Sequence, residues 1–140
     1  MPTEALYVLD ANCIVSAVLL PASIPRQAFD KACSHGTVLL SSPVLNELDD
    51  VLRRPRLEKY VHEEERIHFL VALVREASVI EVSVSISECR DPKDNKYLEL
   101  AVAASATCIV SGDQDLLVLN PYRGIPILTP RQFLELTDAD

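Results

Sequence analysis

Glycine is scarce in this chain, and its scarcity excludes several kinds of phosphate and acyl chemistry. Only Gly36, Gly112 and Gly124 occur among the 140 residues. The chain therefore has no G-x-G-x-x-G turn and no Walker A loop, which use glycines to bring the backbone close to phosphates. It also lacks the G-x-S-x-G elbow that presents a serine nucleophile. Nucleotide cofactors and a serine-hydrolase mechanism are not expected.

Zinc ligands and membrane segments are missing as well. No C-x-x-C pair occurs, and the cysteines and histidines show no metal-ligand spacing, so the cysteines are expected to be reduced core residues. No apolar run is long enough to cross a bilayer, and residues 1–20 hold no basic segment followed by a long apolar one. We expect a cytoplasmic protein without membrane contact, folded as a single domain over residues 1–140.

The net charge of −8 argues mildly against a general nucleic-acid binder, which usually has a basic surface. A cluster of acids that awaits a metal ion would account for several of these charges. The basic residues gather in two short groups, one of Arg53, Arg54, Arg56 and Lys59, and one of Arg90, Lys93 and Lys96.

Short aliphatic runs alternate with amphipathic segments along the whole chain. This alternation predicts a three-layer α/β/α fold, doubly wound, with a central parallel sheet of about five strands. Strands are expected at residues 6–9, 37–40, 79–82, 108–110 and 125–128, and helices at 13–20, 24–34, 43–54, 63–77, 92–106, 113–119 and 130–136.

Some helix boundaries and faces can be predicted as well. Gly36 is expected to end helix 24–34 as a C-terminal glycine stop, and Ser42 is expected to cap the helix that begins at Pro43. Helix 63–77 is expected to bury an apolar stripe made of Ile67, Leu70, Val71 and Val74.

Two of the expected strands lead directly to an acid. Tyr7-Val8-Leu9 precedes Asp10, and Cys108-Ile109-Val110 precedes Ser111-Gly112-Asp113. Ligands of open parallel sheets bind at the carboxyl edge, where both acids would lie. Adjacent strands are ~4.8 Å apart. If these two strands are neighbours, Asp10 and Asp113 face each other across a space that fits a divalent metal ion.

Both acids also have a structural interpretation as helix caps. Asp10 could cap the helix that follows it, although Asn12 could do so instead and leave Asp10 free. The local sequence supports both interpretations of Asp10 equally. Asp113 or Asp115 could cap the short helix after the fourth strand, and we favour Asp113 as a ligand with Asp115 as its helper.

Glu47 is a candidate because of its position on a helix. It lies at the margin of the apolar stripe of helix 43–54, where a carboxylate needs a partner, whereas Asp50 points away. An ion pair with a base such as Arg54 is the alternative interpretation.

Asp94 is a candidate because Asp91 can fill the capping role in its place. Asp91 precedes Pro92 and is expected to be the N-cap of the helix. Asp94 shares a helix face with Leu98 and Ala101, and this apolar face is expected to point inward. A carboxylate that only caps the helix has no need to face inward.

Several carboxylates at one sheet edge would repel one another unless a cation lies between them. Oxygen ligands without a Cys or His set favour Mg²⁺ or Mn²⁺ over zinc. The candidate ligands are Asp10, Glu47, Asp94 and Asp113.

The order of these motifs resembles the PIN-domain family. It begins with Asp10-Ala11-Asn12 and Glu47, continues with Asp91-Pro92-Lys93-Asp94-Asn95-Lys96-Tyr97-Leu98-Glu99 and Ser111-Gly112-Asp113-Gln114-Asp115-Leu116-Leu117, and closes with Thr129-Pro130-Arg131-Gln132-Phe133-Leu134. The resemblance covers essentially the whole chain. It is strongest to the bacterial toxin components of toxin–antitoxin systems, relatives of VapC.

The resemblance implies a PIN-like fold and a Mg²⁺- or Mn²⁺-dependent endoribonuclease, the toxin of a type II toxin–antitoxin pair. It implies an RNA substrate, a cognate antitoxin protein and a homodimer. The implied catalytic and metal-binding acids are Asp10, Glu47, Asp94 and Asp113, supported by Asn12, Ser111 and Asp115. The bases that could guide phosphates are Arg53, Arg54, Lys93 and Lys96.

Two other classes of function remain open. A non-catalytic PIN-like binding module would use the acidic pocket to capture a basic segment of a partner, in keeping with the net charge of −8. A phosphoaspartyl enzyme of the haloacid dehalogenase type, with Asp10 as nucleophile, would need an acid two residues later, where this chain has Asn12.

Overall fold

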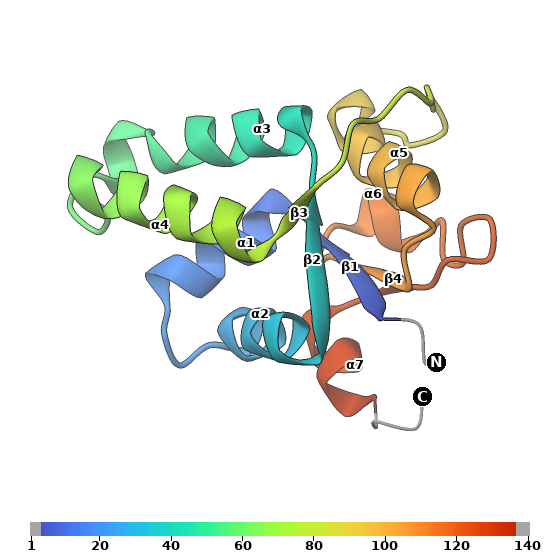
Figure 1. The fold of residues 1–140 in the computed structure, drawn as a ribbon, viewed down its shortest axis with the longest axis horizontal. Coiled ribbons are helices and arrows are strands. Elements are labelled where there is room, and N and C mark those ends of the chain that lie inside the picture. The colour runs from blue at the N-terminus through green and yellow to red at the C-terminus, as the bar shows by residue number, and fades with distance from the viewer. Residues whose placement is uncertain (1–3, 137–140) are drawn as a thin grey trace.

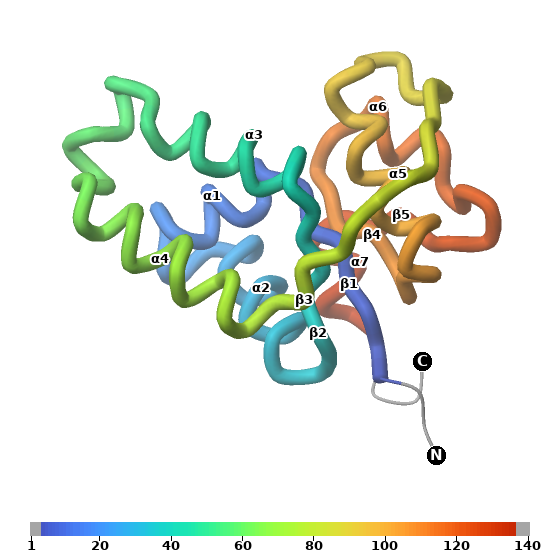
Figure 2. Tube along the Cα trace, turned by 45° about the horizontal axis from the view of Figure 1, so that its top comes forward, coloured from blue at the N-terminus to red at the C-terminus, as the bar shows by residue number. Residues whose placement is uncertain are grey.

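A five-stranded parallel sheet in the order β3-β2-β1-β4-β5 forms the centre of the molecule. The computed structural model describes residues 4–136. Helices α1 to α4 lie on one side of the sheet and α5 and α6 on the other (Figures 1 and 2). The predicted three-layer α/β/α fold is therefore confirmed. The elements are β1 (Ala5–Leu9), α1 (Ala11–Leu19), α2 (Ile24–His35), β2 (Gly36–Leu40), α3 (Ser42–Leu52), α4 (Glu63–Glu76), β3 (Ser78–Val79), α5 (Asn95–Ala104), β4 (Cys108–Val110), α6 (Gln114–Leu117), β5 (Ile127–Leu128) and α7 (Pro130–Glu135), with short 3-10 helices at Pro55–Leu57 and Pro92–Asp94.

Strand β1 is the central strand, and its register brings two predicted site segments together. Its last residues are aliphatic and buried, as expected for a parallel strand covered by helices on both faces. Leu9 pairs with Val110 of β4, so the two strands end level with each other. The backbone N–H of Asp10 donates to the carbonyl of Val110 at 3.1 Å. The residues that follow β1 and β4 therefore begin side by side.

Gly36 follows α2, but not as a left-handed glycine stop. Its backbone is extended, with φ −172° and ψ −151°, and it is the first residue of β2. It pairs with Ala5 of β1, and a Cβ at position 36 would lie 2.3 Å from the Ala5 carbonyl oxygen. The glycine is needed because β1 and β2 approach each other closely here.

Helix α3 begins one residue earlier than predicted. Ser41, not Ser42, is the N-cap, and its side chain accepts a hydrogen bond from the Val44 N–H at 3.4 Å. The backbone of Ser41 is still extended, with φ −133° and ψ 167°, which leaves Ser42 as the first helical residue. The helix ends at Leu52.

Other boundaries differ from the prediction in a similar way. The helix expected over 92–106 starts as a 3-10 turn and becomes α5 only at Asn95. The strands expected at 79–82 and 125–128 and the helix expected at 113–119 are shorter than predicted. Among residues 4–136, none of the helices combines the length and the apolar character that crossing a membrane requires.

The predicted apolar stripe of α4 is confirmed only at Leu70, which is partly buried and packs against the core. Ile67, Val71 and Val74 have relative exposures of 45%, 45% and 42%, whereas Arg66 and Leu73 of the same helix are buried. The Arg66 guanidinium lies 2.5 Å from Oδ1 of Asp49 on α3. The buried face of α4 therefore includes Arg66, Leu70 and Leu73 and is rotated from the predicted stripe.

Candidate metal centre

Asp10 both caps α1 and contacts a second strand end. Its Oδ1 accepts a hydrogen bond from the Cys13 N–H at 2.8 Å, and its Oδ2 accepts one from the Ser111 hydroxyl. Asp10 is only 4% exposed. Asn12 is exposed and does not cap the helix. The two interpretations of Asp10 are therefore compatible, because one carboxylate can cap a helix and still lie at the sheet edge.

Ser111 connects Asp10 to Asp113. Its side chain is fully buried, and its Oγ accepts a hydrogen bond from the Asp113 N–H at 3.0 Å while donating to Asp10. Asp113 is the N-cap of α6, and its Oδ1 accepts from the Asp115 N–H at 2.9 Å. Burial raises the pKa of Asp10 above its ordinary value, although the hydrogen bonds from Ser111 and Cys13 act in the opposite direction, and the nearby charge of Asp113 adds a small further increase. These acids lie close enough to interact electrostatically.

Asp94 is the most unusual acid in the described chain. It is 8% exposed, and its Oδ2 is the only buried side-chain nitrogen or oxygen in residues 4–136 without a hydrogen-bond partner. Leu98 and Ala101 of the same helix face are fully buried, as predicted. Burial, followed by the proximity of Asp113, raises the pKa of Asp94 to about 7. Asp91 and Glu47 add smaller contributions of the same sign.

Asp91 and Asp115 complete an acidic trio with Asp94. One carboxylate oxygen from each lies within 4.8 Å of the others, and within residues 4–136 no other three acids, cysteines or histidines meet this condition. Asp91 Oδ1 caps the 3-10 turn by accepting from the Lys93 N–H at 3.1 Å, as predicted. Asp91 therefore combines the N-cap role with membership of the trio, which the cap alone does not indicate. The three-residue spacing of Asp91 and Asp94, one turn of 3-10 helix, is the signal that could have indicated it.

Glu47 joins the site through Tyr97, which sequence reasoning did not single out. The Tyr97 hydroxyl donates to Glu47 Oε1 and accepts from the Ala11 N–H at 2.9 Å. Tyr97 is 1% exposed, so its ring is held in the core. Burial, and then Glu47, raise the pKa of this phenol. Lys96 Nζ lies 3.3 Å from Glu47 Oε2.

The other predicted phosphate-binding bases do not contact the predicted site acids. Lys93 is exposed and lies 3.8 Å from Asp91 Oδ2. Arg53 follows the C-terminal end of α3 and pairs with Asp49 at 2.9 Å, and Arg54 is exposed beside it. Within residues 4–136, Lys96 is the only one of the four predicted bases that contacts a predicted site acid, which is Glu47.

A cavity of about 310 Å³ adjoins Asp10 and Asp113. Its other walls come from α1, from the start of α2, from Gly112 and from the start of α7. The lining residues are Asp10, Asn12, Cys13, Ser16, Pro25, Gly112, Asp113 and Pro130.

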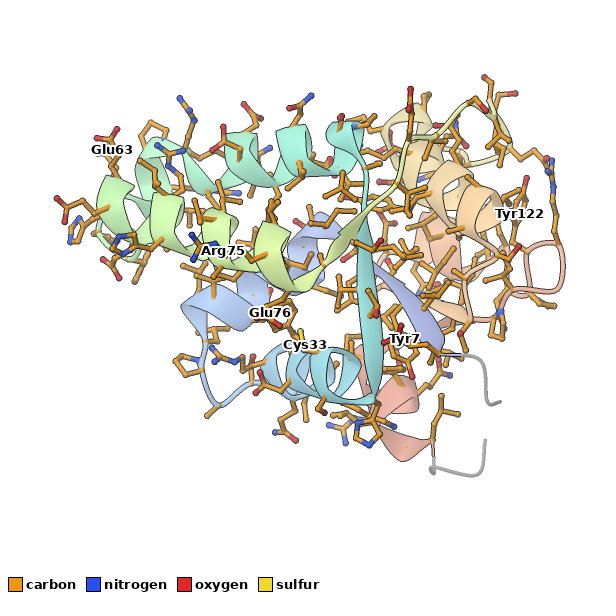
Figure 3. The ribbon with its side chains drawn as sticks, in the orientation of Figure 1. Tyr7, Cys33, Glu63, Arg75, Glu76 and Tyr122 are labelled. Carbon is orange, nitrogen blue, oxygen red and sulfur yellow. The ribbon has the colours of Figure 1, made fainter. Side chains whose placement is uncertain are left out.

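A second cavity of similar volume lies away from the acidic trio, between α1, α2 and α4. Its lining is mainly apolar, with Phe29 and Phe69 among its walls. Cys33 and Glu76 face each other there from α2 and α4 (Figure 3). The cavity contains one acid and therefore offers no metal-binding set.

The acids at the sheet edge influence one another electrostatically, and they are Asp10, Glu47, Asp91, Asp94, Asp113 and Asp115. Within residues 4–136, only Asp91, Asp94 and Asp115 have carboxylate oxygens close enough together to hold one ion, so the structure does not bring Asp10, Glu47 and Asp113 into that trio. Carboxylate oxygens are the donor type that Mg²⁺ and Mn²⁺ prefer.

Known proteins resemble this chain over most of its length. A family model described as PIN domain matches residues 6–115. MJ1680, an uncharacterized protein of Methanocaldococcus jannaschii, is 33% identical over 138 residues, covering 91% of this chain and 88% of that protein.

Two solved structures share the fold. PAE2754 from Pyrobaculum aerophilum has a TM-score of 0.62 at 16% identity and covers 93% of this chain and 87% of its own. VapBC2 from Rickettsia felis, bound to a DNA fragment from the promoter, has a TM-score of 0.60 at 16% identity and covers 89% of this chain and 98% of its own. The family match, the curated relative and the shared fold lead to one conclusion: this chain belongs to the PIN-domain family.

Proposed function

We propose that this protein is a Mg²⁺- or Mn²⁺-dependent endoribonuclease and the toxin of a type II toxin–antitoxin pair. Membership of the PIN-domain family supports a nuclease-type fold. The likeness to VapBC2 supports the toxin assignment and a cognate antitoxin as partner. The proposed substrate is single-stranded or looped RNA, because a strand must enter a narrow acidic site to be cut.

One observation carries the metal part of the proposal: a buried carboxylate oxygen of Asp94 has no hydrogen-bond partner. A buried polar atom without a partner is costly, and a buried charge among like charges more so. A divalent cation at this place would satisfy the oxygen and offset the repulsion from Asp113, Asp91 and Glu47. The donor set therefore fits the ion.

The proposed ligands are Asp10, Asp94 and Asp113, with Glu47 binding directly or through water. A bound ion would supply an activated water for hydrolysis of a phosphodiester and would offset the charge on the phosphate. Ser111 holds Asp10 and the start of α6 in place, and Tyr97 holds Glu47. Lys93, which is exposed near the trio, is the proposed guide for the RNA backbone. The expected products have a 5′-phosphate and a 3′-hydroxyl.

The experiment is a cleavage assay on a mixed RNA pool with Mn²⁺ or Mg²⁺ and with a chelator. We expect cleavage by the wild-type protein only with metal, and no cleavage by Asp94→Asn. Asp50→Asn is the matched control, because Asp50 is an exposed acid on α3 outside the site. Metal-independent cleavage, or full activity of Asp94→Asn, contradicts the proposal.

A second candidate function is favoured by the Lys96–Glu47 contact. The Lys96 ammonium lies 3.3 Å from Glu47 Oε2, so this acidic edge accommodates a basic side chain. A non-catalytic module could accept a Lys or Arg from a partner in the same way. A metal titration separates the two candidates, because the binding module would show no thermal shift with Mg²⁺ or Mn²⁺ and no cleavage.

We also propose a homodimer. The exposed apolar side chains of α4, Ile67, Val71 and Val74, support a protein contact on that face. Light scattering would then give twice the 15.5 kDa mass of one chain. Val71→Lys is expected to shift the mass toward that of the monomer, and a wild-type mass of one chain contradicts the dimer.

A further inference from the structure

We propose that the cavity beside Asp10 and Asp113 binds one nucleoside, the one next to the phosphodiester to be cut, and selects its base. This inference rests on the proposed function and adds a substrate-recognition site to it. The cavity shares Asp10 and Asp113 with the acidic edge, so its occupant would be continuous with a strand bound there.

The size of the cavity suits a single nucleoside. Its volume of about 310 Å³ is at the lower limit of ligand pockets, which begin at roughly 300 Å³. Two acids on one wall disfavour a second phosphate at this place and leave a neutral base as the favoured occupant. A negatively charged backbone group would instead be drawn toward the cation site.

Two polar side chains in the cavity are available for a ligand. Asn12 and Ser16 lie one turn apart on α1, and both line the cavity. Within residues 4–136, neither side chain has a hydrogen bond. The Asn12 amide offers both donors and an acceptor, and the Ser16 hydroxyl offers either. This pair can therefore bond to the donor and acceptor edge of an unstacked base.

The opposite walls are apolar and fixed. Pro25 lies in the first turn of α2, and Pro130 is the first residue of α7. Helix α7 is held against α2 by Lys31, whose Nζ donates to the carbonyls of Phe133 and Leu136, both at 2.8 Å. Proline rings offer apolar surface against which the face of a base can pack. The cavity thus combines apolar walls with a few polar groups, as small-molecule sites usually do.

Gly112 provides a way to close the cavity. A Cβ built at this position meets nothing within 4 Å, so a side chain can be added without a clash. Gly112 lines the cavity, and Gly112→Val would fill part of it. This substitution tests occupancy without removing any acid or any hydrogen-bonding side chain.

The first experiment measures binding without catalysis. Adenosine, cytidine, guanosine and uridine are titrated separately into the ¹⁵N-labelled full chain. We expect amide shifts at Asn12 to Ser16 and at Gly112 and Asp113, strongest for one nucleoside, and at least about a fivefold weaker affinity in Gly112→Val. The absence of shifts at these amides overturns the site. Shifts with free arginine but with no nucleoside show a pocket for a basic partner segment and also overturn it.

The second experiment measures selectivity during cleavage. Short RNAs that differ only in the base next to the cut bond are compared by kcat/KM. We expect Ser16→Ala to change the ratio between the best and worst base by about fivefold, as the loss of one hydrogen bond would. Cleavage with an unchanged ratio in both Ser16→Ala and Gly112→Val overturns the nucleoside site but leaves the ribonuclease proposal intact. Nucleoside binding without any cleavage supports the nucleoside site but contradicts the ribonuclease proposal.

Discussion

Tyr97 joins Glu47 to the beginning of α1. Its phenol donates to Glu47 Oε1 and accepts from the N–H of Ala11, the residue directly after Asp10. A side chain of α5 therefore connects an acid of α3 with the strand end that carries Asp10. The ring is buried, which fixes the direction of both hydrogen bonds.

This relationship predicts that Tyr97→Phe impairs the site while the fold persists. The variant keeps the ring but leaves Glu47 Oε1 and the Ala11 N–H without their partner, at a cost of about 1–2 kcal/mol in the free energy of unfolding. A group that positions a metal ligand typically contributes about tenfold or more to metal affinity, so we expect Mn²⁺ binding, measured calorimetrically, to weaken by that amount.

Tyr122→Phe is the matched control. The Tyr122 hydroxyl also donates to a glutamate, Glu88, at 2.7 Å. That pair includes no candidate ligand, so Mn²⁺ affinity should stay unchanged. Equal losses of metal affinity in the two variants would show that Tyr97 has no special role.

Asp94 predicts a pH dependence of stability in the metal-free protein. Its pKa is raised to about 7 in the folded state, whereas an unfolded Asp has a pKa of about 3.9. Between these values the folded state binds more protons than the unfolded state. The free energy of unfolding should therefore fall as the pH rises from about 4 to about 7, and should change little from this group above that.

The measurement is urea unfolding in chelator across this pH range. Asp94→Asn should flatten the decline and be more stable than wild type at pH 8, because it removes a buried charge without a partner. Asp50→Asn should keep the wild-type slope. An identical slope in Asp94→Asn would assign the dependence to other groups.

Asp10→Asn is expected to abolish cleavage and to leave stability unchanged or higher. Asn caps helices as well as Asp, and its side-chain NH2 group can donate to the Ser111 hydroxyl in place of the hydrogen bond that Asp10 accepts. The substitution removes the Asp10 carboxyl group, whose pKa is raised by burial. Asp10→Ala should instead lose about 1 kcal/mol with the cap. Paired unfolding curves and Mn²⁺-dependent assays test this, and unchanged activity in Asp10→Asn would refute the site.

Gly36→Ala and Gly112→Ala should differ sharply in stability. At position 36 the new methyl group would lie 2.3 Å from the Ala5 carbonyl oxygen, so β1 and β2 must move apart. Overpacking of this kind costs about 1–3 kcal/mol. At position 112 the methyl group meets open space, and little change is expected. Thermal unfolding of both variants tests this prediction, and equal melting temperatures would contradict the expected difference in stability.

The sheet and the placement of its acids could be predicted because local patterns determine them. Buried strands read as aliphatic runs, and the residue after such a run must lie at the carboxyl edge, as Asp10 does. The sequence of α4 allows more than one apolar face, and the structure packs Phe69, Leu70 and Leu73 against the core. The same face includes Arg66, which pairs with Asp49, 17 residues away on a different helix. Such a pair leaves no periodic trace in the sequence.

The resemblance and the motifs predict four acids. Among them, Asp113 raises the pKa of both Asp10 and Asp94, and Glu47 raises the pKa of Asp94. The contributions of Tyr97 and Asp91 could not be read from the motifs. Tyr97 acts through its hydroxyl at the end of a buried ring, and a tyrosine in a helix usually indicates packing. The N-cap role of Asp91 accounts for only one of its two carboxylate oxygens.

The order of strands in the sheet also determines when the acidic edge can exist during synthesis. Strand β4 inserts beside β1 only after more than a hundred residues have been translated, and it is the strand that delivers Ser111 and Asp113. A nascent chain that ends before Asp113 therefore lacks part of the acidic edge, and the proposed metal site cannot form in it.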